Sequence, residues 1–357
     1  LVQEGLRHFR GLGGGELQHH TQVVGQLVRA QAQTGFLPVC DHYSGIPSRM
    51  VQSLELQEEL TREFGACVMD VTLDCEDGAP VGREAAHAAL VAELVANSAK
   101  SARVAVRVHA LDHPAFAEDV RILLLRGGDK LRHIMLPKIE SLENVDRAAQ
   151  QIDAAGGSHI PLHVLLESPL AVSRAYAIAS HPRVASISFG LMDFVSSHAG
   201  AIPSEAMQVD GQFSHPLVVQ AKLQIASACH AYGKTPSHCV VTEFKDDQAI
   251  ARAATQAARQ FGYTRMWSIH PSQVRPILAA FSPDESAVQQ AAEIIEAGYI
   301  VDWAPINHNN RLHDRASYRF YWHVLERAHA TGKALPCGVQ ALFSGQGAAP
   351  QPPHTPW

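Results

Sequence analysis

The feature that most constrains the fold of this chain is a repeated alternation of short apolar runs with helix-length amphipathic stretches. The alternation begins near Phe36, and a few polar or glycine residues follow each apolar run. Strands that alternate with helices form parallel sheets, because each helix returns the chain to the same edge. Eight apolar runs are spaced in this way: 37–40, 67–73, 104–108, 133–136, 162–166, 184–189, 237–241 and 265–269.

Two parallel architectures agree with this pattern, a closed eight-stranded barrel and an open doubly wound sheet. The glycine-rich fingerprint of dinucleotide-binding sheets, Gly-x-Gly-x-x-Gly, follows none of the eight runs, which weakens the open-sheet alternative. We therefore predict an α/β fold, a (β/α)8 TIM barrel over residues 36–283.

The segments on either side of the predicted barrel differ from it in character. Residues 1–35 are predicted to form an N-terminal helical extension. Residues 284–345 contain two helical patterns, the second rich in aromatic side chains, and are predicted to be a C-terminal helical appendage that covers a barrel mouth or contacts a neighbouring subunit. Residues 346–357 are rich in Gly, Ala and Pro, and we expect them to be disordered.

Composition excludes several functional classes. With 357 residues, 46% of them hydrophobic, the chain can bury a large core. A net charge of −6 argues against a nucleic-acid surface. The six cysteines are scattered without a Cys-x-x-Cys pair, which suits a reducing cytoplasm. No apolar run reaches the roughly 18 residues of a membrane helix, and no secretion signal opens the sequence, so we expect a cytoplasmic protein that binds no membrane.

Polar residues follow most of the apolar runs, where a barrel places its active site. Acidic side chains that meet at one mouth repel one another unless a cation lies among them. A divalent ion held by Glu167 and Asp193, with Arg107 and Lys138 nearby, would remove that repulsion. Mg²⁺ fits this role because it takes oxygen ligands and uses only one or two carboxylates; Mn²⁺ is the alternative.

Each of these residues also has a simpler interpretation. Glu167 could cap a helix or pair with Lys138, and Asp193 could cap the helix that follows it. Arg107 could form a structural salt bridge with the Glu76-Asp77 pair. Lys138 could instead form a Schiff base with a carbonyl substrate.

The metal hypothesis predicts enolate chemistry on a 2-oxo acid. A chelated metal polarises the carbonyl while a base moves a proton, and the fork of Arg107 suits the substrate carboxylate. The candidates for the base in the appendage are Asp302 and Asp314.

At this point the chain resembles the citrate lyase β-subunit-like family, which includes the malyl-CoA and citramalyl-CoA lyases. The resemblance covers roughly residues 65–295. It rests on motifs that occur in the family's order: Leu73-Asp74-Cys75-Glu76-Asp77, Val106-Arg107-Val108, Met135-Leu136-Pro137-Lys138, Leu166-Glu167-Ser168-Pro169, Phe189-Gly190-Leu191-Met192-Asp193 and Ile269-His270-Pro271.

The resemblance implies a TIM barrel with Mg²⁺ on Glu167 and Asp193, and Arg107 on the 2-oxo acid. It implies substrate or supporting contacts for Glu76 and Asp77. The resemblance also implies a homo-oligomer, a trimer or hexamer, in which an acid of the appendage reaches a neighbouring active site. Asp314 is the closest counterpart of that acid, and we predict it as the catalytic acid or base in preference to Asp302.

The predicted activity is therefore Mg²⁺-dependent cleavage or formation of a 3-hydroxyacyl thioester such as malyl-CoA or citramalyl-CoA. The products of cleavage would be acetyl-CoA or a homologue and a 2-oxo acid. The first strand and the residue after Arg-Val depart from the family pattern, at His42 and His109. These two are predicted substrate contacts, together with Asp77, Arg107 and Lys138. The alternatives are a metal-dependent aldolase of free 2-oxo acids and a non-catalytic binding subunit.

Overall fold

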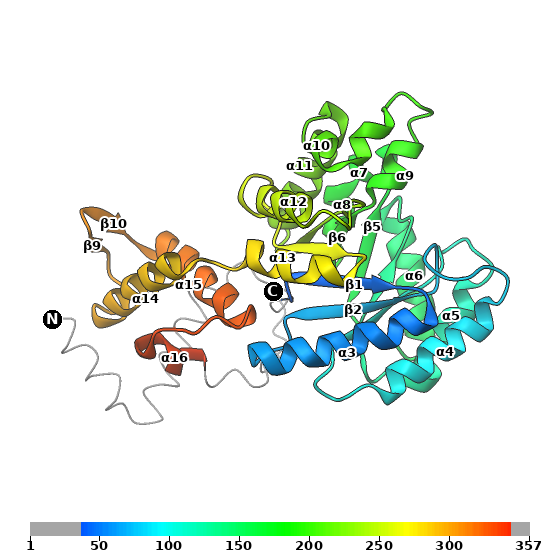
Figure 1. Cartoon of the computed structure of the whole chain (residues 1–357), viewed down its shortest axis with the longest axis horizontal. Coiled ribbons are helices and arrows are strands. Elements are labelled where there is room, and N and C mark those ends of the chain that lie inside the picture. The colour runs from blue at the N-terminus through cyan, green and yellow to red at the C-terminus, as the bar shows by residue number, and fades with distance from the viewer. Residues whose placement is uncertain (1–36, 344–357) are drawn as a thin grey trace. The chain divides into compact units, whose positions relative to one another are not determined.

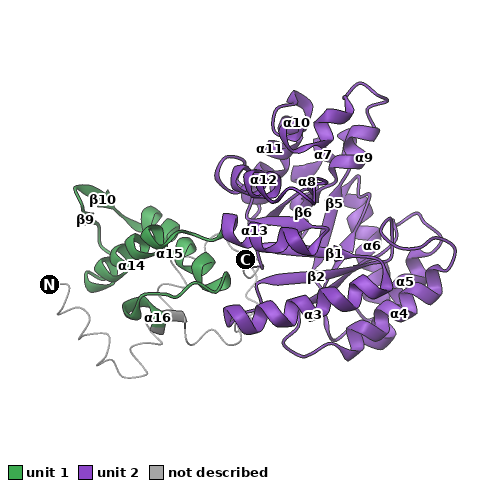
Figure 2. Cartoon of the chain, viewed as in Figure 1, with its two compact units in different colours: residues 1–36, 282–357 green, residues 37–281 purple. Residues whose placement is uncertain are grey.

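The computed structural model describes residues 37–343, which form two compact units (Figure 2). One unit runs from Leu37 to Phe281, and the other begins at Ser282. The predicted N-terminal extension, 1–35, and the predicted disordered tail, 346–357, lie outside the described residues.

The first unit is a closed barrel of eight parallel strands in sequential order, which confirms the predicted TIM-barrel fold (Figure 1). Each strand pairs with the next, and β1 closes the barrel by pairing with β8. The strands are β1 (Cys40–Ser44), β2 (Met69–Asp74), β3 (Val104–Arg107), β4 (Leu131–Leu136), β5 (Leu162–Leu166), β6 (Val184–Phe189), β7 (Thr235–His238) and β8 (Arg265–Ser268).

Helices surround the barrel, and some of them begin at side-chain caps. The Ser141 hydroxyl accepts from the backbone N–H of Asn144 at the start of α6, and Asp246 caps α12 in the same manner. The helices are α3 (Pro47–Phe64), α4 (Glu84–Asn97), α5 (Phe116–Gly127), α6 (Leu142–Ala154), α7 (Pro169–Ser173), α8 (Ala175–Ala179), α9 (Leu191–Ser196), η1 (Ser204–Met207), α10 (Val209–Gln212), α11 (Pro216–Ala231), α12 (Asp247–Arg259) and α13 (Pro271–Phe281).

Two strands lie away from their predicted positions. β1 occupies Cys40–Ser44 rather than 37–40, and β7 occupies Thr235–His238 rather than 237–241. Both strands carry polar side chains that are buried, so an apolar run does not mark them. The strands with apolar sequences, β5 and β6, cover the residues predicted for them, 162–166 and 184–189.

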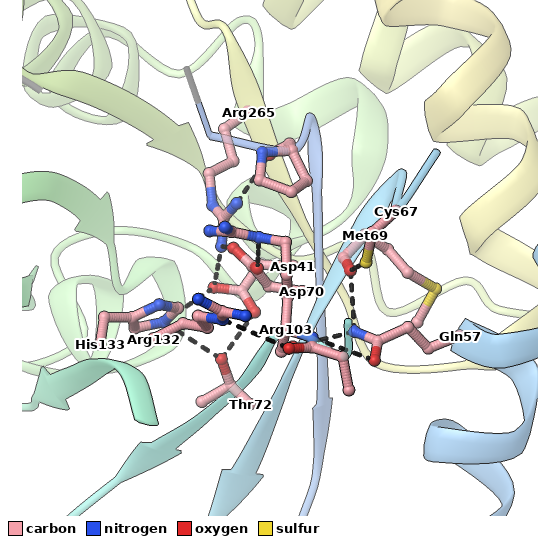
Figure 3. A network of polar contacts seen from close by, with 12 residues as sticks. Asp41, Gln57, Cys67, Met69, Asp70, Thr72, Arg103, Arg132, His133 and Arg265 are labelled. Atoms are coloured by element: carbon pink, nitrogen blue, oxygen red, sulfur yellow. Dashed lines mark hydrogen bonds and ion pairs between the residues drawn. The ribbon is translucent and has the colours of Figure 1, made fainter. Parts of the chain in front are cut away.

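The main apolar core lies between the strands and their helices, where alternate strand residues such as Leu162, Val164 and Leu166 are fully buried. The other set of alternate residues faces the barrel interior. Near the amino-terminal ends of the strands this interior is charged (Figure 3). Arg265 places one guanidinium nitrogen 2.8 Å from Asp41 and 2.7 Å from Asp70, and Arg103 bonds Asp70 at 2.6 Å.

Two stacked imidazoles complete this buried layer. The rings of His133 and His163 lie 3.6 Å apart, and both side chains are essentially inaccessible to solvent. Two carboxylates and two guanidiniums balance in charge, so burial of the layer leaves no net charge uncompensated. An apolar layer of Tyr43, Met135, Leu165 and Trp267 also forms part of the barrel interior.

The second unit packs α14 (Glu285–Ile300) on α15 (Arg315–Ala330), and α16 (Cys337–Phe343) contacts α14. Between α14 and α15 the chain forms an antiparallel hairpin of β9 (Ile306–His308) and β10 (Arg311–His313). Trp303 and two aromatic residues of α15, Tyr318 and Trp322, contribute to its core. In the described part of the chain, no helix has the length and apolar character needed to span a membrane.

Candidate active site

The carboxyl ends of five consecutive strands bring most of the predicted site residues together. Glu76 and Asp77 follow β2, Arg107 ends β3, and Lys138 follows β4. Glu167 follows β5, and Asp193 lies in the first turn of α9, after β6. Because the strands are parallel neighbours, these side chains share one mouth of the barrel, the end where TIM-barrel enzymes hold their active sites.

Asp74 holds the guanidinium of Arg107 in a fixed orientation. Arg107 donates from Nε to Asp74 Oδ1 at 2.7 Å and from Nη2 to Oδ2 at 2.5 Å. The same carboxylate accepts from the backbone N–H groups of Glu76 and Gly78, at 3.0 and 2.8 Å. Burial raises the pKa of Asp74, but the Arg107 charge and these bonds outweigh it and hold the pKa below its ordinary value.

Lys138 connects the acids that follow β2 and β5. Its ammonium donates to Glu76 Oε1 at 2.6 Å, and its backbone N–H donates to Glu167 Oε1 at 3.1 Å. The side chain is partly exposed; burial opposes its charge, but Glu76 raises the pKa of the amine above its ordinary value. A protonated amine is a poor nucleophile, so this geometry does not favour the Schiff-base alternative.

Glu167 is the acid whose ionisation costs most at this mouth. It is 6% exposed, while Asp193 is exposed. Burial, and then the adjacent Asp193 carboxylate, raise the pKa of Glu167 to about 8. Gly190 leaves space for the Glu167 side chain, since a Cβ at this position would stand 2.5 Å from Glu167 Cγ.

The donor set of Glu167 and Asp193 fits a hard divalent cation. Both offer carboxylate oxygens, and a bound cation would offset the buried negative charge of Glu167. Another group, Asp41, His133 and His163, places potential ligand atoms within 4.8 Å of one another. Arg265 already neutralises Asp41 there, so a divalent ion would leave two positive charges buried without compensation. The predicted cation position therefore stays at Glu167 and Asp193.

Two aromatic rings lie beside Arg107 within the barrel. The guanidinium carbon is 5.6 Å from the centre of the Tyr43 ring and 6.0 Å from that of Trp267. The two rings are 4.1 Å apart, and the Trp267 indole N–H donates to Ser188 Oγ at 3.0 Å. These contacts attract the guanidinium through the faces of the rings.

The two predicted histidines have partners within the protein. His42 is 2% exposed, and its Nδ1 lies 2.9 Å from Ser268 Oγ; burial and then His270 lower its pKa to about 4. His109 is 9% exposed, and its Nδ1 lies 2.6 Å from Asp119 Oδ2. Their roles as substrate contacts stay predictions.

The predicted acid or base, Asp314, belongs to the second unit, where it caps α15. Its Oδ1 accepts from the backbone N–H of Ala316 at 2.9 Å, and Ser317 completes a capping box. The side chain is exposed. Asp302 lies outside the regular elements and has a left-handed backbone, with φ of 52°.

Sequence reasoning did not single out Asp74, Tyr43 or Trp267 for this site. A signal for Asp74 was present: Asp70, Thr72 and Asp74 alternate along β2, so they share the face that points into the barrel. No comparable signal marks Tyr43 and Trp267, because their contact joins the first and last strands.

Comparison with known proteins shows the family of the chain. Residues 55–271 match the family model described as HpcH/HpaI aldolase/citrate lyase. An L-malyl-CoA/β-methylmalyl-CoA lyase of Cereibacter sphaeroides is 32% identical over 255 residues, 67% of this chain and 80% of the relative. A malyl-CoA/β-methylmalyl-CoA/citramalyl-CoA lyase of Chloroflexus aurantiacus is 27% identical over 244 residues, 62% of this chain and 70% of the relative.

Among solved structures, a citrate lyase from Burkholderia xenovorans LB400 is similar over 89% of this chain and 99% of its own, with 45% sequence identity and a TM-score of 0.75. A citrate lyase-like protein from Mycobacterium tuberculosis, crystallised with magnesium, acetoacetate and coenzyme A, shares the fold at 20% identity. Its coverage is 84% of this chain and 99% of its own, and its TM-score is 0.60. The chain therefore belongs to the HpcH/HpaI aldolase/citrate lyase family of carbon–carbon lyases.

Proposed function

We propose that this enzyme is a Mg²⁺-dependent lyase of 3-hydroxyacyl thioesters such as malyl-CoA or citramalyl-CoA. Cleavage would give acetyl-CoA or a homologue and a 2-oxo acid, and condensation would be the reverse. The observation that carries the proposal is the buried Glu167 beside Asp193, on the same barrel mouth as the oriented guanidinium of Arg107. The malyl-CoA lyases among the relatives support the choice of a thioester.

Glu167 and Asp193 are the residues that would hold Mg²⁺. When bound, the ion supplies Lewis-acid polarisation of carbonyl and carboxylate oxygens. Mn²⁺ takes the same oxygen ligands and would substitute for it.

The remaining residues of the mouth orient the substrate. Arg107 uses Nε and one Nη2 hydrogen on Asp74, and its Nη1 lies 3.3 Å from Glu76 Oε2. The remaining hydrogens of Nη1 and Nη2 are available to a 2-oxo acid carboxylate. Lys138 pairs with Glu76 at 2.6 Å, next to the substrate position. We assign the proton transfer to a carboxylate oxygen of Asp314, delivered from a neighbouring subunit of a homo-oligomer.

A second function, aldol cleavage to free 2-oxo acids without CoA, is favoured by one observation. The first strand supplies His42 and Tyr43, which depart from the family pattern, and Tyr43 lies against Arg107. Free hydroxy acids tested beside thioesters separate the two functions, because an aldolase of this kind turns over the free acids.

The test is cleavage of a panel of malyl-CoA and citramalyl-CoA thioesters by the wild type with Mg²⁺, by the wild type with EDTA, and by Glu167→Gln. We expect turnover only in the first case. Turnover that survives both EDTA and the substitution would overturn the metal mechanism. Mg²⁺ binding that depends on Glu167, without turnover of any thioester, would overturn the substrate assignment alone.

A further inference from the structure

Lys138 has a backbone conformation that lysine rarely adopts. Its φ is +53°, in the left-handed region that costs a residue with a Cβ roughly 1–2 kcal/mol. Among the described residues, the other non-glycine positions with positive φ are Ala199, Asp302, Trp303, Asn309 and Asn310. None of these follows a barrel strand directly. Interactions at the barrel mouth must offset the free-energy cost of this left-handed backbone at Lys138.

The two hydrogen bonds of Lys138 explain the conformation. Rotation about the N–Cα bond, which φ measures, sets the direction of the side chain relative to the backbone N–H. At +53° the N–H reaches Glu167 Oε1 while the ammonium reaches Glu76 Oε1. At a strand value of φ, the same residue would direct its side chain elsewhere. One residue therefore meets two acids that follow different strands.

We propose that Lys138 is a positioning residue for the metal carboxylate, and that it acts through its backbone. The ammonium–Glu76 ion pair holds the left-handed conformation, and the amide thereby stays on Glu167. That hydrogen bond, 3.1 Å long, holds the Glu167 carboxylate in place next to Asp193. This inference rests on the proposed function, because it takes Glu167 and Asp193 as the Mg²⁺ ligands.

The proposal predicts that two variants of Lys138 differ in their affinity for Mg²⁺. Lys138→Met removes the ammonium but keeps a Cβ, so nothing offsets the cost of the left-handed backbone, and the amide leaves Glu167. Lys138→Gly removes the same ammonium but adopts positive φ freely. Both variants lose the same positive charge, a loss that by itself favours cation binding. The ratio of their Mg²⁺ dissociation constants therefore measures the backbone contribution.

The experiment is calorimetric titration of each variant with Mg²⁺, with Mn²⁺ as a second probe. We expect Lys138→Met to bind Mg²⁺ roughly fivefold more weakly than Lys138→Gly, or worse, from the cost of the left-handed backbone. A ratio near one, or weaker binding by Lys138→Gly, would overturn the proposal. Ala199→Gly is the matched control, because Ala199 has φ of 52° and is exposed, and this variant should bind like the wild type.

Glu167→Gln separates failure of this inference from failure of the proposed function. Loss of Mg²⁺ binding in Glu167→Gln together with a ratio near one would overturn the role of Lys138 alone. Unchanged Mg²⁺ binding in Glu167→Gln would overturn the metal assignment, and the role of Lys138 with it.

Discussion

Arg107 and Asp74 face each other through two parallel hydrogen bonds, of 2.7 and 2.5 Å, with the carboxylate almost completely buried. This geometry is the bidentate pairing in which an arginine fork is most strongly oriented. The guanidinium that we assign to the 2-oxo acid therefore has its direction set before substrate binds.

We expect Asp74→Asn to weaken both folding and substrate binding. The change removes the bidentate carboxylate of a largely buried guanidinium and leaves it only Glu76, at 3.3 Å, so we expect a loss of up to about 3–5 kcal/mol of unfolding free energy. Urea unfolding would measure this loss, and titration with a 2-oxo acid would measure the loss of orientation. Asp77→Asn is the control in the same loop: the Asp77 side chain is 60% exposed, and its change should cost less than about 1 kcal/mol. Equal effects of the two variants would contradict the role of Asp74.

Gly190→Ala tests the space that the Glu167 side chain occupies. The added Cβ would stand 2.5 Å from Glu167 Cγ, so we expect the Glu167 side chain to shift from its present position beside Asp193. We expect Mg²⁺ affinity to fall at least roughly tenfold, the scale of supporting-residue effects on metal sites. Gly127→Ala, whose Cβ would meet Val95 on α4, is the control for a crowded glycine away from the mouth. An unchanged Mg²⁺ affinity in Gly190→Ala would show that Glu167 is not held in this position.

Acid should destabilise the barrel through His133 and His163. Burial, and then neighbouring charges, hold the pKa of both imidazoles well below the ordinary value of 6.5. Below pH 6.5, these two histidines therefore bind protons in the unfolded chain but not in the folded chain. This contribution to stability is complete above pH 6.5 and is lost as the pH falls toward the folded-state pKa values.

The expected slope is about 1.4 kcal/mol per pH unit for each histidine below pH 6.5. Urea unfolding at a series of pH values would measure it. His133→Asn and His163→Asn should each reduce the slope, whereas substitution of the exposed His159 should not. A stability that stays constant from pH 6.5 to 5 would refute the assignment.

Asp314 caps α15, so a test of its catalytic role needs a variant that keeps the cap. Asparagine caps a helix about as well as aspartate but cannot take up the proton. We expect Asp314→Asn to keep the melting temperature and lower kcat by roughly 10²-fold or more, while Asp314→Ala also loses about 1 kcal/mol of stability. Wild-type kcat in Asp314→Asn would remove this residue from the mechanism.

The bounds of a strand could be predicted from the sequence where its residues form an apolar run. Strands β5 and β6 are rich in apolar residues, notably on the face that packs against the helices, and were predicted at their observed bounds. Strand β1 buries the polar residues Asp41 and His42, so its sequence resembled a loop.

The grouping of the site residues was also predicted from the strands. The order of strand ends predicted that Glu167, Asp193, Arg107 and Lys138 share one mouth, because parallel neighbours must end together. The left-handed backbone of Lys138 could not be predicted in this way. It depends on two acids from different strands that only the closed barrel brings within reach.

Arg265 supplies a positive charge that the nascent chain lacks until its last strand has been synthesised. This residue opens the last strand, and its guanidinium bonds two carboxylates on the first two strands and the carbonyl of Pro38. A polypeptide that ends before Arg265 holds two aspartates in its interior with only Arg103 to balance them. We therefore expect the barrel to reach its full stability only after its final strand has been synthesised, because only then are both buried carboxylates neutralised.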